Sequence, residues 1–169
     1  MRLSAPVGLE SHLIKFGLFM PQVAKSVLVP HAAQTMFDLV DAVERYPEFL
    51  PWCDGARVLE RDGERTVASI DIRYAGVVQS FTTENLKRNG ESMILTLREG
   101  PFRHLHGLWT FTRLADEASK VELQLEYSFA NRLLETAVGP VFGMIADTLI
   151  DRFVLRAEAL SKLPVPARG

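Results

Sequence analysis

The chain has 169 residues, of which 47% are hydrophobic and 24% are charged, and its formal net charge at pH 7 is −2. This length and composition suit one globular domain with a sizeable core. The charge balance gives no general attraction to DNA or RNA. Arginine outnumbers lysine by 14 to 5, and the overall balance does not exclude local basic patches. The single Cys53 excludes an internal disulfide and a cysteine-based zinc cluster. We therefore expect a reducing, cytoplasmic environment.

The N-terminal residues are predicted to be a leader that is disordered or lies before the real start at Met20. The apolar run in this segment is interrupted by Lys15 and Gly17, and no apolar run in the chain reaches membrane-spanning length. A signal peptide would need a longer apolar core and a small-residue cleavage site. A segment that touches a membrane is the alternative. The predicted organisation is a leader, one domain and a short tail, at residues 1–19, 20–163 and 164–169.

The domain is predicted to begin with a strand over 23–29, which alternates, is rich in β-branched residues and stops at Pro30. An amphipathic helix follows over 32–43, with its apolar residues on one side. The next segment, YPEFLPWC at 46–53, has two prolines four residues apart, which forbid a regular helix. Its other large residues are apolar, so this loop must either pack on the core or line an opening into it.

Six further strands are predicted, separated by short turns that contain glycine or polar residues. The last of them is the clearest, because apolar residues from Val121 to Phe129 alternate with polar ones. Short connections between successive strands favour an antiparallel meander. The predicted strands are 56–60, 67–74, 77–86, 92–98, 105–114 and 121–129.

A long helix is predicted over 140–162, where two neighbouring rows of apolar residues make a wide apolar face. Pro140 suits the first position of a helix, where its missing N–H has no effect. A shorter helical segment is expected before it, over 131–138. The predicted fold class is therefore α+β, with a curved antiparallel sheet wrapped around the long C-terminal helix. Periodicity leaves open whether the space between them is filled or hollow.

Three groups of residues are candidates for chemistry, and none forms a catalytic constellation. Cys53 lies in an apolar loop without a nearby basic residue, so we expect a structural thiol. The pair His104 and His106 could bind a metal together with a carboxylate such as Glu99, but the sequence does not place that third ligand, so we expect an ordinary surface. Asp147 and Asp151 lie one helical turn apart, beside arginines typical of a solvated face. We therefore predict no enzyme activity, no catalytic residue and no metal.

Three segments carry a resemblance to a known family: 28–53, which contains the paired prolines around Phe-Leu, 98–111 (REGPFRHLHGLWTF) and 139–157 (GPVFGMIADTLIDRFVLRA). Over about residues 21–162 the chain resembles the coenzyme Q-binding START-domain family, in the branch of the bacterial ribosome association toxin RatA. That family lies within the START-like, or polyketide cyclase, superfamily. The resemblance implies the helix-grip fold, in which a curved sheet and a C-terminal helix enclose a hydrophobic cavity.

The first function that the resemblance implies is binding of an isoprenoid quinone such as ubiquinone, in support of respiration, without catalysis or a catalytic cofactor. Cytoplasmic location with peripheral contact at the inner membrane would fit this function. Replacing Leu50 with lysine is then predicted to abolish quinone retention and to leave the fold intact. The implied binding residues form a mouth (Tyr46, Pro47, Phe49, Leu50, Pro51, Trp52), a wall (Leu95, Leu97, Trp109, Phe111, Leu123, Leu125) and a floor (Phe142, Ile145, Leu149, Phe153).

The second implied function is that of a toxin which binds the large ribosomal subunit and blocks its joining to the small one. Basic side chains must then meet RNA phosphate, with no role for DNA. Ordinary solvated turns are the alternative reading of these residues. Polyketide cyclase activity is a third function of the superfamily, but its catalytic pattern is not visible in this sequence. The candidate ribosome contacts are Lys87, Arg88, Arg98 and Arg103.

Overall fold

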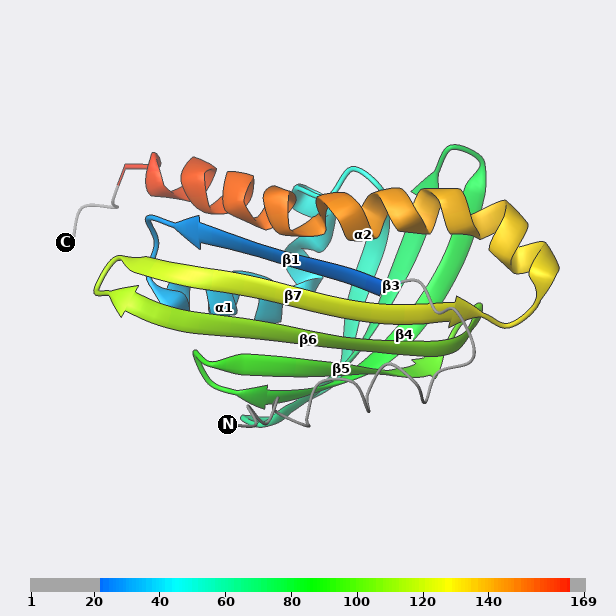
Figure 1. The fold of residues 1–169 in the computed structure, drawn as a ribbon, viewed down its shortest axis with the longest axis horizontal. Coiled ribbons are helices and arrows are strands. Elements are labelled where there is room, and N and C mark those ends of the chain that lie inside the picture. The colour runs from blue at the N-terminus through cyan, green and yellow to red at the C-terminus, as the bar shows by residue number, and fades with distance from the viewer. Residues whose placement is uncertain (1–21, 165–169) are drawn as a thin grey trace, which may run out of the picture.

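The structure is a computed structural model that describes residues 22–164, so the predicted leader and nearly all of the predicted tail lie outside the described residues. It contains one sheet, two α-helices and one 3-10 helix (Figure 1). The elements in chain order are β1 (Gln22–Val29), α1 (Ala33–Asp41), η1 (Val43–Glu48), β2 (Cys53–Arg61), β3 (Arg65–Tyr74), β4 (Val77–Arg88), β5 (Ser92–Glu99), β6 (Phe102–Ala115), β7 (Ala118–Phe129) and α2 (Arg132–Ser161).

All seven strands form one antiparallel sheet in the order β1-β7-β6-β5-β4-β3-β2. The predicted meander from β2 to β7 is therefore confirmed, and β1 closes the order by pairing with β7. Irregularities in the pairing of β2 with β3, β4 with β5 and β6 with β7 act as bulges that add twist and curvature. In Figure 1, β3 and β4 consequently run at a steep angle to β1, β6 and β7.

The predicted amphipathic helix is present as α1, which ends at Asp41. The proline-containing segment after it is not an irregular loop throughout, because η1 includes Pro47. A 3-10 helix is short enough to place proline where a longer α-helix would lose a hydrogen bond. The phenol of Tyr46 donates a hydrogen bond of 2.5 Å to the carbonyl of Val40, which ties η1 back to α1.

The long C-terminal helix begins earlier than the sequence pattern suggested. Asn131 caps α2 by accepting a hydrogen bond of 2.9 Å from the backbone N–H of Leu134, and the helix then continues through Pro140. The prediction that the helix starts at Pro140 is wrong, and the expected lead-in is simply its beginning. A proline inside a helix removes one hydrogen bond and bends the axis. Figure 1 shows the yellow first turns of α2 at an angle to the turns that follow.

Because α2 is continuous, it is long and apolar enough to cross a bilayer by length and composition alone. The sequence pattern, which divides this segment at residues 139–140, did not anticipate one helix of this length. In this structure α2 instead lies against α1, β1, β4 and β7. A helix at the core of a globular protein can have the same length and composition, so these two properties do not place the chain in a membrane.

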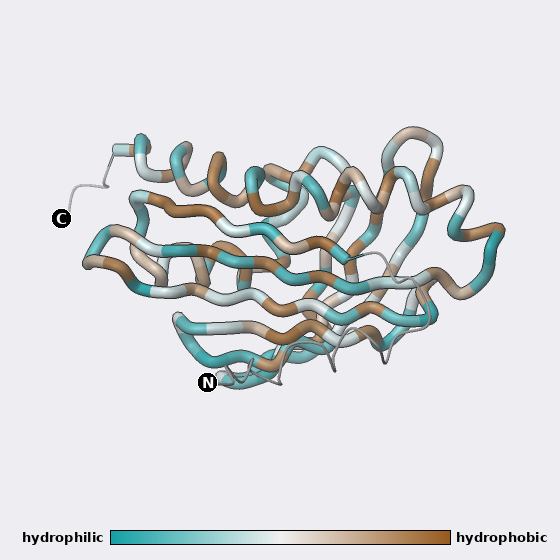
Figure 2. The backbone as a smooth tube through the Cα atoms, viewed as in Figure 1, coloured by the Kyte–Doolittle hydropathy of each residue, from teal (hydrophilic) through white to brown (hydrophobic). Residues whose placement is uncertain are grey.

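The core lies between the concave face of the sheet and the two helices. Hydrophobic and hydrophilic residues alternate along β6 and β7 (Figure 2), as the sequence predicted. The inner row of β7 is buried throughout, and α2 contributes a matching buried row. The predicted helix-grip architecture is confirmed by this arrangement. The residues of these two rows are Val121, Leu123, Leu125, Tyr127 and Phe129 on β7, and Phe142, Ile145, Ala146, Ile150 and Phe153 on α2.

The helix cap gives a first test of this fold. We expect Asn131→Ala to lower the free energy of unfolding by about 1 kcal/mol, because the N–H of Leu134 loses its acceptor. For a domain of this size the melting temperature should fall by about 2 to 4 °C. Thermal unfolding followed by circular dichroism would measure the shift. Asn131→Ser, which keeps a capping oxygen, should melt close to the wild type, and equal losses in both variants would contradict the assigned cap.

Candidate ligand cavity

A cavity of about 70 Å³ lies between the sheet and α2. Its wall is almost entirely apolar and comes from η1, Trp52 and the inner faces of β3 to β7, and α2 forms its remaining side. A water molecule needs roughly 10–15 Å³ of such space, so the cavity is hollow on the scale of several waters. The question that periodicity left open is thus answered: the core between sheet and helix is partly hollow.

Nine of the sixteen predicted binding residues line this cavity: Tyr46, Trp52, Leu95, Trp109, Leu125, Phe142, Ile145, Leu149 and Phe153. Among the others, Leu50, Phe111 and Leu123 are buried in the surrounding core, whereas Phe49 and Leu97 are half-buried. Pro47 and Pro51 are exposed. The paired prolines therefore shape the segment around Tyr46 and Trp52 without reaching the cavity, and ligand binding by any of these residues stays a prediction.

Sequence reasoning missed eight residues of the cavity wall, most of them on strands whose inner face was hard to assign. The alternation in β3 was a usable signal, because Ala68 and Ile70 share a face in it. In β4 both faces carry threonine and polar residues, so nothing in the pattern marks Thr83 and Asn85 as inward. The missed residues are Val43, Ala68, Ile70, Phe81, Thr83, Asn85, Leu105 and Ala146.

Aromatic rings frame one end of the cavity. The ring of Phe153 on α2 lies edge-on to the rings of Tyr46, Phe49 and Trp109, at centroid distances of 5.3, 5.3 and 5.5 Å. Edge-to-face pairs of this kind add to the stability gained from burial alone. Phe153 therefore joins η1, β6 and α2 at this end.

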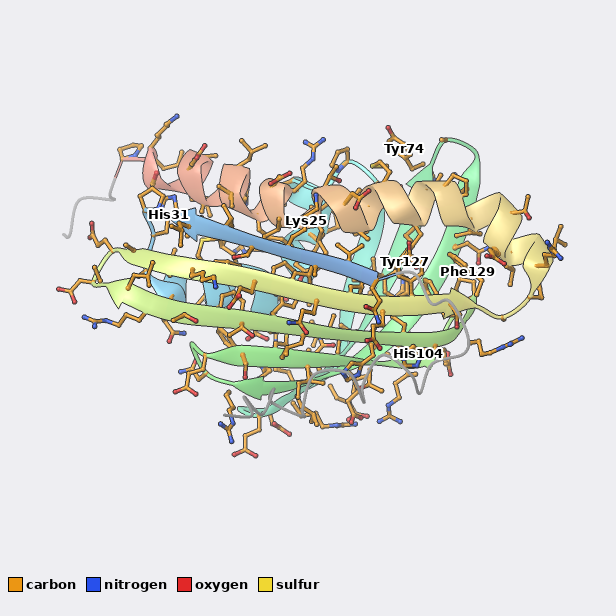
Figure 3. The ribbon with its side chains drawn as sticks, in the orientation of Figure 1. Lys25, His31, Tyr74, His104, Tyr127 and Phe129 are labelled. Atoms are coloured by element: carbon orange, nitrogen blue, oxygen red, sulfur yellow. The ribbon has the colours of Figure 1, made fainter. Side chains whose placement is uncertain are left out.

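A second aromatic cluster lies nearer the start of α2. Phe142 contacts the rings of Tyr127, Phe102 and Phe81, at centroid distances of 4.7, 4.8 and 6.4 Å. Figure 3 shows Tyr127 and Phe129 between β7 and α2. Burial raises the pKa of the Tyr127 phenol, and the nearby carboxylate of Asp147 raises it further. The cavity thus lies between two aromatic clusters, to which Phe142 and Phe153 belong.

The segment beside the cavity is held to α2 by charged groups as well as by rings. The guanidinium of Arg156 donates a hydrogen bond of 2.5 Å to the carboxylate of Glu48. The same guanidinium lies 5.2 Å from the centre of the Phe49 ring, in cation–π geometry. We call this set of three residues the η1–α2 latch. It accounts for Phe49, which was predicted to form the mouth and instead lies outside the cavity.

The candidate chemical groups of the sequence do not come together at the cavity. Burial raises the pKa of the Cys53 thiol to about 11, so this thiol is protonated at neutral pH and is a poor nucleophile. His104 and His106 stack on the outer side of the sheet, where His104 Nε2 lies 3.7 Å from a carboxylate oxygen of Glu126. Within residues 22–164, no three metal-ligating side chains gather into a site.

The four candidate ribosome contacts do not form one patch. Lys87 and Arg88 lie at one end of the β4–β5 pair, opposite Ser92, whereas Arg98 lies near the other end. The ammonium of Lys87 is buried in an ion pair with Asp41 at 3.0 Å, and its side chain is only 5% exposed. It could reach a phosphate only by breaking that pair.

The other three cations are exposed. Arg98 donates a hydrogen bond of 2.6 Å to Glu84, and Arg103 donates one of 3.3 Å to the carbonyl of Ala130. Arg88 makes no ion pair or side-chain hydrogen bond with any residue in the described part of the chain. Its guanidinium is therefore the most available of the four for an external phosphate.

Residues 29–154 match the family described as polyketide cyclase / dehydrase and lipid transport. The chain belongs to this family. The match covers most of the domain, including every strand from β2 to β7 and most of α2, and it confirms the resemblance on which the sequence-based expectations rest. The family description itself joins enzymes and lipid carriers, so membership alone does not separate these activities.

Relatives of the chain within the family carry two kinds of name. A protein of Escherichia coli K12 named ribosome association toxin RatA is 40% identical over 141 residues, which are 83% of this chain and 89% of the relative. Its namesake from Vibrio cholerae O395 is 44% identical over 139 residues, or 82% of this chain and 96% of the relative. The mitochondrial coenzyme Q-binding protein coq10 of Schizosaccharomyces pombe is 25% identical over 146 residues, which are 82% of this chain and 87% of the relative.

Solved structures support the fold. A protein of Thermus thermophilus superposes with a TM-score of 0.72 at 21% identity, over 84% of this chain and all of that one. The Zhui aromatase/cyclase from a Streptomyces species superposes with a TM-score of 0.71 at 17% identity, over 85% of this chain and 97% of that one. A START superfamily protein of Mycobacterium smegmatis superposes with a TM-score of 0.68 at 20% identity, over 82% of this chain and 98% of that one. At these identities the likeness extends to architecture and not to activity.

Proposed function

We propose that this protein is a non-catalytic binding protein that holds the hydrophobic part of an isoprenoid quinone between the sheet and α2. The observation that carries the proposal is the apolar cavity, which Trp109, Phe142 and Phe153 line together. Each methylene buried there would contribute about 0.8 kcal/mol, so a few isoprene units suffice for tight binding. The relative named as a coenzyme Q-binding protein supports this ligand class.

The cavity must widen to admit such a ligand. Its volume of about 70 Å³ is well below the roughly 300–1,000 Å³ typical of sites for drug-sized molecules. We propose that the η1–α2 latch opens for entry, because it joins the segment beside the cavity to the helix through side chains at the surface. Exchange at the surface of a membrane, with the protein otherwise cytoplasmic, would fit a ligand that is nearly insoluble in water.

The direct test of the proposal is organic extraction of protein that was expressed in its native host and purified without detergent, followed by mass spectrometry for quinones. We expect isoprenoid quinone in near-stoichiometric amount. A protein that carries none, and that takes up none when quinone is added, would refute the proposal. A parallel extraction of a cavity-filling variant gives the matched control and separates specific binding from surface adsorption.

A second candidate function is association with the large ribosomal subunit. The relatives named ribosome association toxin favour it, since their identity to this chain reaches 44% and extends over most of both chains. We propose that exposed arginines would carry the contact and that Arg88 is the first of them to test. Because the net charge of the chain is −2, binding to RNA would be local and weakened by salt.

We expect Arg88→Glu to weaken binding to purified large subunits several-fold and to lower the salt dependence by roughly one phosphate contact. Co-sedimentation at a series of salt concentrations would measure both quantities. Arg152→Glu is the control, because that arginine is exposed on α2, far along the chain from β4. Equal losses in the two variants, or binding that is unchanged at high salt, would contradict the assigned contact.

A further inference from the structure

The wall of the cavity has one polar part, and it lies on β4. Thr83 and Asn85 both line the cavity, both are more than nine-tenths buried, and the hydroxyl of Thr83 donates a hydrogen bond of 2.9 Å to Asn85 Oδ1. Thr66 of β3 pairs with Asn85 across the strands and is completely buried. We call Thr83 and Asn85 the polar wall; Thr66 lies next to Asn85 in the core but does not line the cavity. The inner face around it is otherwise formed by Ala68, Ile70 and Phe81.

Polar groups in such a position are unfavourable unless they are hydrogen-bonded. Thr66 Oγ1 is buried without a hydrogen-bond partner, and so is the indole Nε1 of Trp52, which lines the same cavity. The Thr83–Asn85 hydrogen bond uses the acceptor of the amide, and within residues 22–164 the Asn85 amide nitrogen has no assigned acceptor. Three buried groups therefore have unused hydrogen-bonding capacity: those of Trp52 and Asn85, which line the cavity, and that of Thr66 beside Asn85.

Most of that capacity is for donation. The indole N–H of Trp52 can only donate, the amide of Asn85 keeps two N–H groups, and the hydroxyl of Thr66 can do either. An occupant that offers oxygen acceptors and no donors would match this set. A quinone ring meets this condition through its carbonyl oxygens, to which ubiquinone adds methoxy oxygens, whereas a hydrocarbon tail offers nothing to these groups.

We infer that the polar wall is the subsite for the ring of the quinone, with Asn85 donating a hydrogen bond to a ring oxygen. This inference rests on the proposed quinone-binding function and adds an orientation to it. The ring enters first and lies against β4, and the isoprenoid tail extends from it along the apolar surface of α2. Asn85 and Thr83 are then specificity-determining residues that separate quinones from other isoprenoid lipids.

The test compares two ligands: a ubiquinone with two isoprene units, and an isoprenoid hydrocarbon of matched length that has no ring. Equilibrium dialysis of the full chain, with the bound ligand quantified by mass spectrometry, gives a Kd for each. We expect Asn85→Leu to weaken quinone binding about tenfold, as the loss of one buried hydrogen bond predicts, and to leave hydrocarbon binding unchanged. Thr83→Val removes the hydrogen bond to Asn85 Oδ1 and so disturbs the orientation of the Asn85 amide. This variant should also weaken quinone binding and leave hydrocarbon binding unchanged.

Thr82→Val is the matched control, because Thr82 neighbours Thr83 on β4 but points to the opposite face of the sheet. It should change neither Kd. Equal losses for both ligands in the Asn85 and Thr83 variants, or no loss for either ligand, would overturn the ring subsite while the proposed function stands. Failure of the wild type to bind either ligand would overturn the proposed function and the subsite with it. If Asn85→Leu does not fold, the nearly isosteric Thr83→Val decides the test.

Discussion

Replacing Leu50 with lysine is expected to unfold the protein, or to lower its free energy of unfolding by several kcal/mol. Leu50 is 1% exposed and belongs to the same hydrophobic core as Trp52 and Phe153. A buried ammonium without a partner is strongly unfavourable, and the total stability of a typical domain is only about 5–15 kcal/mol. Urea denaturation followed by tryptophan fluorescence would measure the loss, because both tryptophans of the chain line the cavity.

Leu59→Lys is the control for this substitution, because Leu59 is 57% exposed on β2 and its replacement should be nearly neutral. A Leu50→Lys protein as stable as the wild type would show that the segment after η1 is not part of the core. The sequence-based prediction was that this variant keeps its fold and loses only quinone. The burial of Leu50 contradicts it. An apolar loop with two prolines suggests the mouth of a cavity, but the side chains of Tyr46, Leu50 and Trp52 are buried in the core.

Replacing Leu149 with tryptophan is expected to abolish quinone uptake in a protein that still folds. Leu149 lines the cavity from α2 but is only half-buried, so a larger side chain at this position meets less resistance than one at the tightly packed Ala146. An indole there would occupy the space that the ligand needs. Quinone content after extraction should fall to background, while the melting temperature should change by only a few degrees, as for a modest packing change.

Leu155→Trp supplies the control, since Leu155 lies on the same helix and is 55% exposed. It adds the same indole outside the cavity and should leave the quinone content at the wild-type level. If the Leu149 variant stays folded and retains its quinone, the ligand lies elsewhere on the molecule. If both variants lose quinone equally, the effect comes from the helix surface and not from the cavity.

Most of the fold follows from local patterns in the sequence. The alternation from Val121 to Phe129 predicts β7 because one face of the strand meets the core and the other meets solvent. Short turns, such as the one at Ala75–Gly76 where both residues have positive φ, then force neighbouring strands to pair. These signals are local, so they can be read without knowledge of the tertiary structure.

What the sequence could not supply depends on contacts between distant segments. Pro140 reads as a helix start, because the packing of α2 next to it comes from distant segments: Phe142 contacts rings on β4, β6 and β7. Lys87 reads as a solvated turn residue, because its partner Asp41 lies 46 positions earlier. The local pattern does not show which way Asn85 points, and only its pairing with Thr66 on β3 and Leu95 on β5 places it on the inner face.

The same limit applies to the cavity. Nine predicted residues line it because apolar residues on facing elements tend to meet, but sequence patterns contain no information on how completely they fill the space between them. The size of about 70 Å³ results from the curvature of the sheet and the position of α2. These depend on bulges such as the one between Thr82 and Thr83, where β4 pairs irregularly with β5.

The measurement that most directly tests the central claim is nuclear magnetic resonance of methyl-labelled protein titrated with a short-tail ubiquinone. If the ligand lies between the sheet and α2, intermolecular nuclear Overhauser effects should connect it to the methyl groups of Ile145, Leu149 and Leu125, which line the cavity. Effects confined to exposed methyl groups, such as those of Leu133 and Leu155, would place the ligand on the outer surface and contradict the claim.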